Sequence, residues 1–406
     1  MITAVSSYPL LLRPSLAVLS FLAHSKSPLL NPDTSPPLRL LLKTTFYAQF
    51  CAGENLPEVR QTLKTLRDCG YKGAMLAHAK EVVLTATDAE SLDDVCEEQA
   101  KTSAADIATW ERNTLDTIEL AQEDDFVAIK FTGAGRQALQ HLKAGIACAP
   151  AFEEAIHKIC KLSEQRGVRL LFDAEQAWLQ EGIDDWTLYF MKTYNTKRAL
   201  VYGTYQAYAK RTPGQLARHL AEAQKHNFAL GVKLVRGAYM GSDARELFWN
   251  TIEDTHACYN GIAKSLMQRQ YAEVLKPVTH GAEFPRVDLV LASHNAQSIA
   301  LARQLRDEQA TKNEPRIEMA YGQLMGMADN VSSELVQISK ERRALGDPNV
   351  DVPKAYKYLV WGTMGECMKY LLRRAQENKD AVSRTIEARQ ALGRELARRM
   401  GLVKRW

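Results

Sequence analysis

The chain has 406 residues, of which 46% are hydrophobic and 25% charged, with a formal net charge of +4. This composition supports a large buried core and excludes wholesale disorder. The small net charge and the lack of a long basic stripe argue against a nucleic-acid-binding protein. The seven cysteines are scattered without a CxxC pair or a Cys/His cluster, so they indicate no disulfide framework and no metal site, and a reducing compartment fits best.

The N-terminal region differs in composition from the rest of the chain. It contains no acidic residue before Asp33, and Arg13 and Lys26 stand among leucines and serines. That composition is typical of a mitochondrial transit peptide. A helix that packs on the following domain is an equally good interpretation.

The apolar run near the N-terminus does not predict a transmembrane span, because Pro9, Arg13 and Pro14 interrupt it. The sequence NPDTSPP at 31–37 then reads as a linker. We therefore expect an extension over residues 1–45 and a single domain over residues 46–406.

Short β-rich runs alternate eight times with helical segments after residue 45. The expected strands are Gly73–Ala77, Phe126–Phe131, Val168–Ala174, Ala199–Gln206, Leu230–Val235, Val287–Ser293, Ile317–Gln323 and Lys354–Val360. One of the helices between them is expected to begin with Thr212 as its N-cap and Pro213 in its first turn.

Eight such units predict an α/β protein of the (β/α)8 type, the TIM barrel, with an N-terminal helical extension. A doubly wound open sheet is the alternative. It is usually marked by a Gly-rich first turn, and FTGAGRQA at 131–138 matches GxGxxG poorly.

Polar residues stand near the C-terminal ends of seven of the eight expected strands. They are Lys130, Asp173, Gln206, Lys233 with Arg236, His294 with Asn295, Gln323, and Tyr358. Active sites of such barrels lie at these strand ends, so we expect the side chains to converge on one mouth. Lys130 and Lys233 interrupt aliphatic runs, where a buried lysine without a partner would be costly.

Two adjacent arginines, Arg373 and Arg374, are expected on the helix after the eighth strand. Taken alone, they favour a solvated helix face, with Arg373 and Glu377 as an i,i+4 pair. Together with the cations at the strand ends they suggest something else. A ring of cations with few acids predicts an anionic ligand, either a carboxylate, a pyrophosphate or both.

Several segments together resemble the proline dehydrogenase family. They are FDAEQ (172–176), YGTYQAY (202–208), GVKLVRGAYM (231–240), ASHNAQSI (292–299), YGQLMGMAD (321–329) and YLLRRAQEN (370–378). The resemblance covers about residues 45–380 in order, and FYAQFCAGE at 46–54 is most similar to the fungal mitochondrial form. It implies a distorted (β/α)8 barrel that holds FAD across the strand ends.

The resemblance also implies a substrate site for L-proline. Arg373 and Arg374 match paired arginines that bind the proline carboxylate together with the lysine at Lys130. Glu377 matches the acid that steadies the arginines. Tyr358 matches a tyrosine beside the substrate ring.

The same resemblance implies catalytic and cofactor-binding residues. Asp173 matches an acid near the flavin, and Lys233 occupies a basic position that contacts it, so both are assigned to catalysis. The residues expected along FAD are Ala174, Gln206, Lys233, Arg236, Gly237, Ala238, Ser293 and His294.

The family activity is the FAD-dependent oxidation of L-proline to pyrroline-5-carboxylate, the first step of proline degradation to glutamate. Electrons pass to a membrane quinone, on the matrix side of the mitochondrial inner membrane. Gly203, where relatives often have asparagine, and Trp361, in YLVWGTMGE, depart from the family pattern.

Two other hypotheses remain open. A Schiff-base aldolase would use Lys130 or Lys233 as its nucleophile. A catalytically impaired homologue would bind FAD and proline without turnover.

Overall fold

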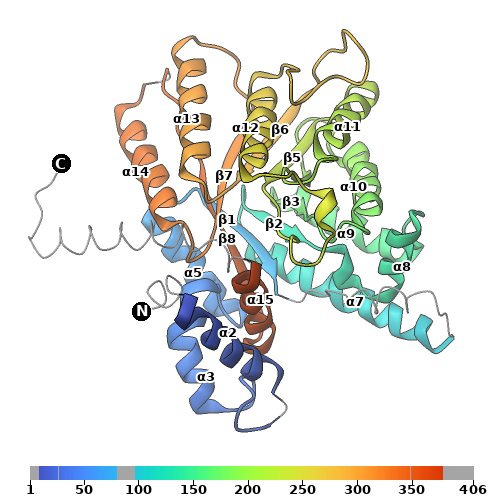
Figure 1. Ribbon diagram of the computed structural model, residues 1–406, viewed down its shortest axis with the longest axis vertical. Coiled ribbons are helices and arrows are strands. Elements are labelled where there is room, and N and C mark those ends of the chain that lie inside the picture. The colour runs from blue at the N-terminus through green and yellow to red at the C-terminus, as the bar shows by residue number, and fades with distance from the viewer. Residues whose placement is uncertain (1–8, 26, 80–96, 348, 378–406) are drawn as a thin grey trace, which may run out of the picture.

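The computed structural model describes residues 9–25, 27–79, 97–347 and 349–377 (Figure 1). Eight parallel strands form a closed barrel in which each strand pairs with its neighbours in sequence and β1 pairs with β8. The strands are β1 (Gly73–His78), β2 (Phe126–Ile129), β3 (Arg169–Phe172), β4 (Val201–Gln206), β5 (Leu230–Val235), β6 (Val287–Ala292), β7 (Met319–Leu324) and β8 (Ala355–Trp361). The predicted (β/α)8 barrel is confirmed, and each expected strand overlaps an observed one.

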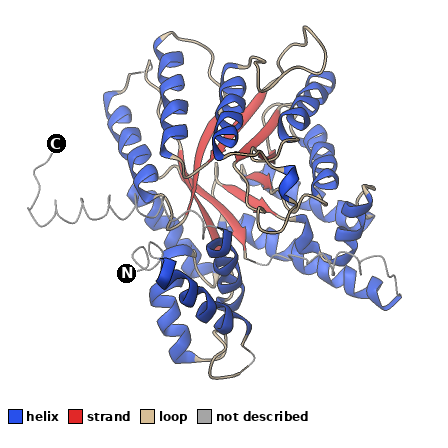
Figure 2. Cartoon of the chain, in the orientation of Figure 1, coloured by secondary structure: helices blue, strands red, loops and turns tan. Residues whose placement is uncertain are grey.

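Helices surround the barrel and extend below it (Figure 2). Those along the outside are α5 (Leu56–Cys69), α7 (Glu97–Leu120), α8 (Arg136–Ala144), α9 (Pro150–Arg166), α10 (Gln180–Tyr194), α11 (Thr212–His226), α12 (Ile252–Gln268), α13 (Ala296–Thr311) and α14 (Asp329–Leu345). Short 3-10 turns, η3 (Phe131–Ala134) and η4 (Arg245–Leu247), lie in the loops after β2 and β5. Helix α15 (Met364–Glu377) follows β8.

Side-chain caps mark where several of these helices begin. Thr251 accepts a hydrogen bond from the Asp254 amide and Asp254 reciprocates, which forms a capping box at α12. Asn295 caps α13 by accepting a hydrogen bond from the Ser298 amide. The expected N-cap at Thr212 is wrong by one residue: α11 begins at Thr212, whose hydroxyl donates to the main-chain oxygen of Gln206 at 2.6 Å.

Side chains alternate along each strand between the barrel interior and the helices outside. The interior is filled by Met75, Phe126, Leu171, Tyr202, Val290, Ala320 and Tyr356. Intervening residues such as Val127, Leu170 and Val232 pack against the helices. Both faces of every strand are buried, as is usual in a parallel sheet.

Arg169 closes the N-terminal end of the barrel. It is the first residue of β3, and its guanidinium carbon lies 3.8 Å from the centroid of the Phe126 ring. The same guanidinium donates to the Tyr356 hydroxyl at 2.9 Å and to the main-chain oxygen of Asp124. Arg169 and these aromatic rings thus fill the end of the barrel opposite the predicted mouth.

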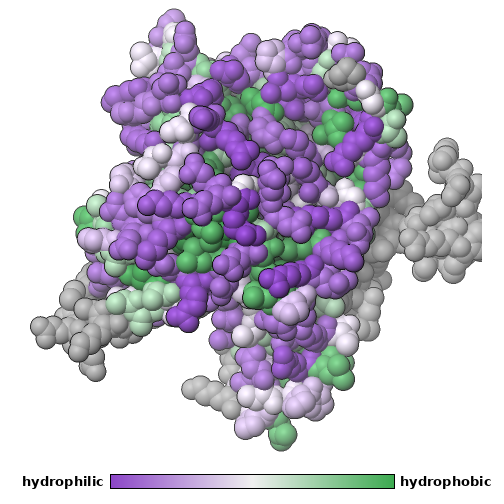
Figure 3. Space-filling view, turned by 180° about the vertical axis from the view of Figure 1, so that it is seen from behind, coloured by the Kyte–Doolittle hydropathy of each residue, from purple (hydrophilic) through white to green (hydrophobic). Residues whose placement is uncertain are grey.

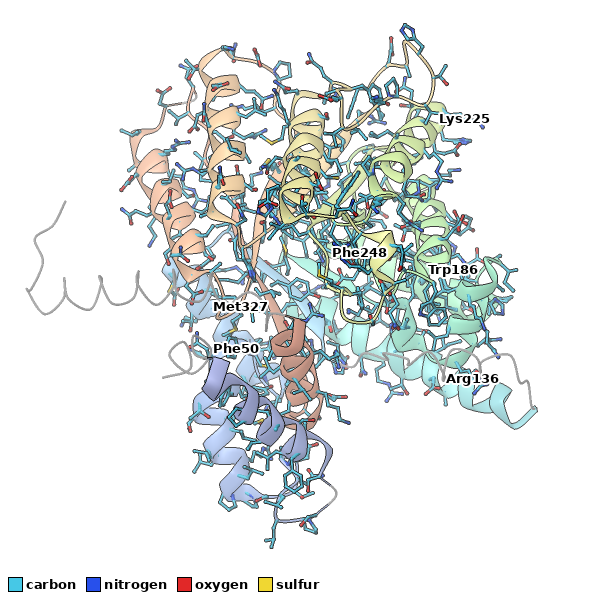
Figure 4. The ribbon with its side chains drawn as sticks, viewed as in Figure 1. Phe50, Arg136, Trp186, Lys225, Phe248 and Met327 are labelled. Atoms are coloured by element: carbon cyan, nitrogen blue, oxygen red, sulfur yellow. The ribbon has the colours of Figure 1, made fainter. Side chains whose placement is uncertain are left out.

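The N-terminal segment forms a helical layer against α15. This N-terminal layer comprises α2 (Pro9–His24), α3 (Pro36–Leu42), the π-helix η1 (Lys43–Tyr47) and α4 (Ala48–Phe50), and α2 packs on α15 (Figure 1). The expected boundary at residue 45 falls inside η1. Figure 4 shows Phe50 close to Met327, and a side chain at Gly326 would meet the Phe50 ring at 2.6 Å. None of the helices in the described ranges is long and apolar enough to cross a membrane.

Candidate active site

A buried lysine, aspartate and tyrosine meet at the C-terminal ends of three different strands. The ammonium of Lys233, in β5, lies 2.5 Å from one carboxylate oxygen of Asp173, the residue after β3. Tyr358, in β8, donates from its hydroxyl to the other oxygen at 2.9 Å. The Lys233 nitrogen also lies 5.0 Å from the centroid of the Tyr358 ring. One carboxylate therefore joins the ends of strands three, five and eight.

This cluster holds Tyr358 in its neutral form. Burial, and next the Asp173 carboxylate, raise the pKa of Tyr358 well above its ordinary value. The guanidinium of Arg374 acts in the opposite direction, which means that this side chain lies within electrostatic reach of the hydroxyl. Tyr358 is therefore a hydrogen-bond donor at every ordinary pH, with a cation beside it.

Arg373 and Arg374 lie on α15, and both side chains are partly buried. The guanidinium carbon of Arg374 lies 5.8 Å from the centroid of the Tyr370 ring on the same helix. The face of α15 that carries the two arginines is therefore partly buried, whereas the arginines alone suggest a solvated face. The side chain of Glu377 lies outside the described part of the structure.

Lys130 follows β2 and reaches a tyrosine from another loop. Its ammonium donates to the Tyr239 hydroxyl at 3.1 Å, and its main-chain oxygen accepts from the Trp110 indole at 3.0 Å. Tyr239 lies in the loop between β5 and α12 and is buried. Tyr239 belongs to the segment GVKLVRGAYM, and neither its sequence pattern nor the family resemblance predicts a role for it. No periodicity signal could have found this contact, because it joins two loops.

The loop after β5 also fixes the two residues between Arg236 and Tyr239. The Ala238 amide donates to the Gln206 side chain at 3.2 Å. Gly237 has φ +143°, and a side chain there would lie 1.7 Å from the Tyr208 ring. Only glycine fits this close approach without moving the loop.

Arg236 spans the ends of β5 and β6. Its guanidinium donates to the hydroxyls of Ser293 and Ser298 at 2.5 and 2.7 Å, and it stacks over the Tyr259 ring at 4.3 Å. His294 accepts a hydrogen bond from the Leu324 amide at 3.1 Å, which ties β6 to β7.

The residues expected along FAD form a donor set that suits a flavin nucleotide. Lys233 and Arg236 supply positive charge for a pyrophosphate or a reduced ring. Thr204 is the register partner of Lys233, and its buried hydroxyl has no hydrogen-bond partner among the residues that the structure describes. Ala174, next to Asp173, is also buried. These features fit the cofactor.

Three polar or unusual positions do not join this cluster. The prediction that Gln323 converges on the mouth is wrong: its alternation places it with Tyr321 on the outer face of β7, where its amide donates to the Ser293 main-chain oxygen at 3.2 Å. Gly203 faces α10, because a side chain there would meet Thr187 at 3.2 Å. Trp361 also faces outward and donates to the Thr117 hydroxyl at 3.1 Å. The two departures from the family pattern therefore lie outside the barrel mouth.

Comparison with known proteins agrees with this architecture. The proline dehydrogenase family model matches residues 59–387. Proline dehydrogenase 1, mitochondrial, from Dictyostelium discoideum is 30% identical over 403 residues, which cover 85% of this chain and 63% of the relative. Hydroxyproline dehydrogenase from Bos taurus is 28% identical and is covered to 82%.

A solved structure supports the fold independently. Proline utilization A (PutA) from Bdellovibrio bacteriovorus, inactivated by N-propargylglycine, superposes with a TM-score of 0.65 at 16% identity. The alignment covers 91% of this chain and 37% of that one, so the chain spans only part of the length of PutA, as it does of the Dictyostelium relative. With the family model matching most of its length, the chain belongs to the proline dehydrogenase family.

Proposed function

We propose that this protein catalyses the FAD-dependent oxidation of L-proline to pyrroline-5-carboxylate. The observation that carries the proposal is the joined cluster of Lys233, Asp173 and Tyr358, with Arg374 in electrostatic reach, in a chain of the proline dehydrogenase family. FAD supplies the two-electron acceptor for oxidation of the C–N bond. The side chains supply binding, orientation and charge.

Substrate binding rests on the cations of α15 and of the loop after β2. Arg373 and Arg374 offer planar, forked donors that match a carboxylate, and Lys130 adds a third positive charge. Tyr358, anchored to Asp173, packs beside the ring of the substrate. Held in this way, the substrate presents its ring carbon C5 in one orientation, so the entropy cost of orienting the reacting atoms is met on binding. Cationic surroundings also disfavour the ammonium form of proline, so the amine loses its proton before oxidation.

The lysines fit this role better than that of a Schiff-base nucleophile. A Schiff-base lysine must present a neutral amine to a carbonyl. Lys233 is instead engaged as a cation with the buried Asp173 carboxylate, and Lys130 donates to the Tyr239 hydroxyl. Borohydride trapping with a carbonyl substrate would reveal an aldolase, and we expect no trapping.

Hydroxyproline is the second candidate substrate, because a hydroxyproline dehydrogenase is among the relatives. Tyr358 argues for proline. Its ring and hydroxyl are both fixed, the ring beside Lys233 and the hydroxyl on Asp173, so neither can move aside for a 4-hydroxyl group.

The test is a visible spectrum of the purified protein with FAD, recorded without oxygen before and after addition of L-proline. We expect a yellow protein that L-proline bleaches. Arg374→Ala should need far more proline for the same bleaching, because losing one charged fork to a desolvated carboxylate costs about 2–5 kcal/mol. Arg343→Ala, which removes an exposed arginine of α14, is the matched control and should bleach normally. A colourless protein that takes up no added FAD would refute the proposal, as would a yellow protein that proline leaves unbleached.

We further propose that electrons leave to a quinone at a mitochondrial membrane and that the N-terminal layer docks there. Relatives carry the word mitochondrial in their names. Figure 3 shows scattered hydrophobic side chains among hydrophilic ones at the lower tip of the molecule. The N-terminal layer, together with the loop between α2 and α3, exposes large apolar side chains. They are Val18, Phe21, Leu29, Leu30, Leu40 and Leu41. Arg39 and Lys43 lie among them but are ion-paired with Glu54, so the docking rests on the apolar side chains.

Sedimentation with anionic phospholipid vesicles tests this docking. The double variant Leu40→Glu/Leu41→Glu should stay in the supernatant. Leu345→Glu, at an equally exposed leucine on α14, is the control and should sediment like the parent protein. Equal sedimentation of both variants would count against docking through the N-terminal layer. The fungal character of residues 46–54 and import directed by the N-terminus stay predictions.

A further inference from the structure

Asp33, in the loop between α2 and α3, caps the helix that carries the arginine pair. One carboxylate oxygen of Asp33 accepts a hydrogen bond from the Gly365 amide at 2.8 Å, across 332 positions of sequence. Gly365 lies in the first turn of α15, where main-chain amides have no partner inside the helix. A carboxylate at this end also interacts favourably with the helix dipole.

Local contacts satisfy two other amides at this end of the helix. The Thr363 amide donates to the Glu366 carboxylate at 3.0 Å, and the Glu366 amide donates to the Thr363 hydroxyl at 3.3 Å. This reciprocal pair is a capping box within the sequence of α15 itself. Asp33 adds a cap that comes from a distant segment, and so it links the position of α15 to the N-terminal layer.

The loop that presents Asp33 is itself ordered by hydrogen bonds. The Asp33 amide donates to the Asn31 side chain at 2.8 Å, and the Ser35 amide donates to the Asn31 main-chain oxygen at 3.0 Å. The Thr34 hydroxyl donates to the main-chain oxygen of Pro28 at 3.1 Å. The segment that reads as a linker in the sequence is therefore a built turn.

The helix shows the same fit from its own side. A side chain added at Gly365 would lie 2.3 Å from the second carboxylate oxygen of Asp33. Glycine at this position therefore makes room for the aspartate. Two further contacts tie α15 to the layer: the Tyr47 hydroxyl donates to the Gly362 main-chain oxygen at 2.9 Å, and α2 packs along the helix.

We propose that Asp33 is a positioning residue for proline binding, because it fixes the N-terminal end of α15 and thereby the placement of Arg373 and Arg374. The inference rests on the function proposed above. Gly365 and Arg374 are nine residues apart, or about 14 Å along a helix, and a helix transmits a displacement at one end to the other. A shift of about 1 Å in a clamping side chain is enough to weaken a reaction strongly.

The test compares KM and kcat in the FAD-loaded, full-length protein. Asp33→Ala should raise the KM for proline about fivefold, the equivalent of one lost helix cap, while kcat at saturating proline changes less than about twofold. Asp33→Asn keeps the acceptor but not the charge and should fall between. The dissociation constant of tetrahydrofuran-2-carboxylate, a ring carboxylate that lacks an amine to oxidise, should rise in the same order when followed by the flavin spectrum.

Asn55→Ala is the matched control. Asn55 caps α5 by accepting from the Glu58 amide at 3.1 Å, and α5 carries none of the candidate site residues. The Asn55→Ala variant should have a lower thermal stability than the parent protein, with the same KM for proline and the same dissociation constant for the analogue. If Asp33→Ala behaves like Asn55→Ala, the inference is overturned.

Arg374→Ala separates this outcome from a failure of the proposed function. If Arg374→Ala weakens binding of the analogue but neither Asp33 variant does, the function stands and the positioning role falls. If Arg374→Ala itself leaves binding unchanged, the proposed carboxylate clamp is wrong. Should Asp33→Ala fail to fold, Asp33→Asn alone decides the question by its effect on the analogue.

Discussion

The buried ion pair of Asp173 and Lys233 allows a sharp test of the site. Both side chains are less than one tenth exposed, and their charged atoms lie 2.5 Å apart. Removing one partner of such a pair leaves an uncompensated buried charge, which costs about 3–5 kcal/mol. Asp173→Asn preserves the shape of the side chain and can still accept from Tyr358, so we expect the lower end of that range, about 3 kcal/mol in the free energy of unfolding.

The double variant Asp173→Asn/Lys233→Met removes both charges. Because no lone charge remains, its loss should be smaller than the sum of the two single losses by at least about 2 kcal/mol. The free energies come from guanidinium unfolding of FAD-free protein, since differences in cofactor affinity would otherwise enter the stability. The slopes with denaturant must match between variants for the comparison to hold.

An exposed pair of the same chemistry provides the control. Lys192 and Glu222 lie 2.7 Å apart on the surface, each side chain about one third exposed. Glu222→Gln should cost less than about 1 kcal/mol. If Asp173→Asn costs no more than this control, or if the two losses at Asp173 and Lys233 simply add, the pair is not the buried, coupled unit described above.

Three further predictions follow from single residues. Burial lowers the pKa of His219, in α11, to about 3, so its contribution to stability is complete above pH 6.5 and is lost as pH falls. The free energy of unfolding of the parent protein should therefore fall by about 2 kcal/mol between pH 6.5 and 5, and His219→Gln should not show this fall. Parallel pH dependence of the two proteins over this range would contradict the prediction. Tyr358→Ser should lower kcat/KM for proline and narrow the gap to 4-hydroxyproline, whereas an unchanged ratio would return Tyr358 to a packing role. Gly237→Ala should weaken FAD binding, measured by flavin fluorescence, because its side chain would collide with Tyr208, while Gly241→Ala, which meets nothing within 4 Å, should bind FAD normally.

The sequence predicted the barrel well because each strand carries its own signal. Runs such as LGVKLV and VDLVLA at 230–235 and 287–292 are short, β-rich and bounded by helical segments, so their existence does not depend on distant contacts. The eight repeats of this unit then leave few topologies open.

The two faces of a strand were harder to distinguish. In a parallel barrel both faces are buried, so alternation of polar and apolar residues does not separate inside from outside. Gln323 and Lys357 illustrate this. They are register partners on the outer face, and Lys357 is satisfied there by Asp329 at 2.6 Å. A polar residue near a strand end therefore predicts the barrel mouth only weakly, unless it is known whether its side chain points into the barrel or outward.

Contacts between distant segments could not be predicted from the sequence. The pairing of Lys130 with Tyr239 joins loops 109 positions apart, and Asp33 reaches α15 across almost the whole chain. Nothing in local composition specifies such a partner, because a carboxylate in a turn looks the same whether or not a helix end lies opposite. The resemblance to proline dehydrogenases supplied the assignment of Lys130 but not its partner.

Arg169 at the N-terminal end of the barrel limits the routes by which a small molecule can enter and leave the protein. With its guanidinium stacked on Phe126 and bonded to Tyr356, that end offers no passage. A small molecule that enters at the opposite end must also leave there. Under the proposed function, product leaves and proline enters through the same end of the barrel. Product should therefore act as a competitive inhibitor, and its release should contribute to the time of each catalytic cycle.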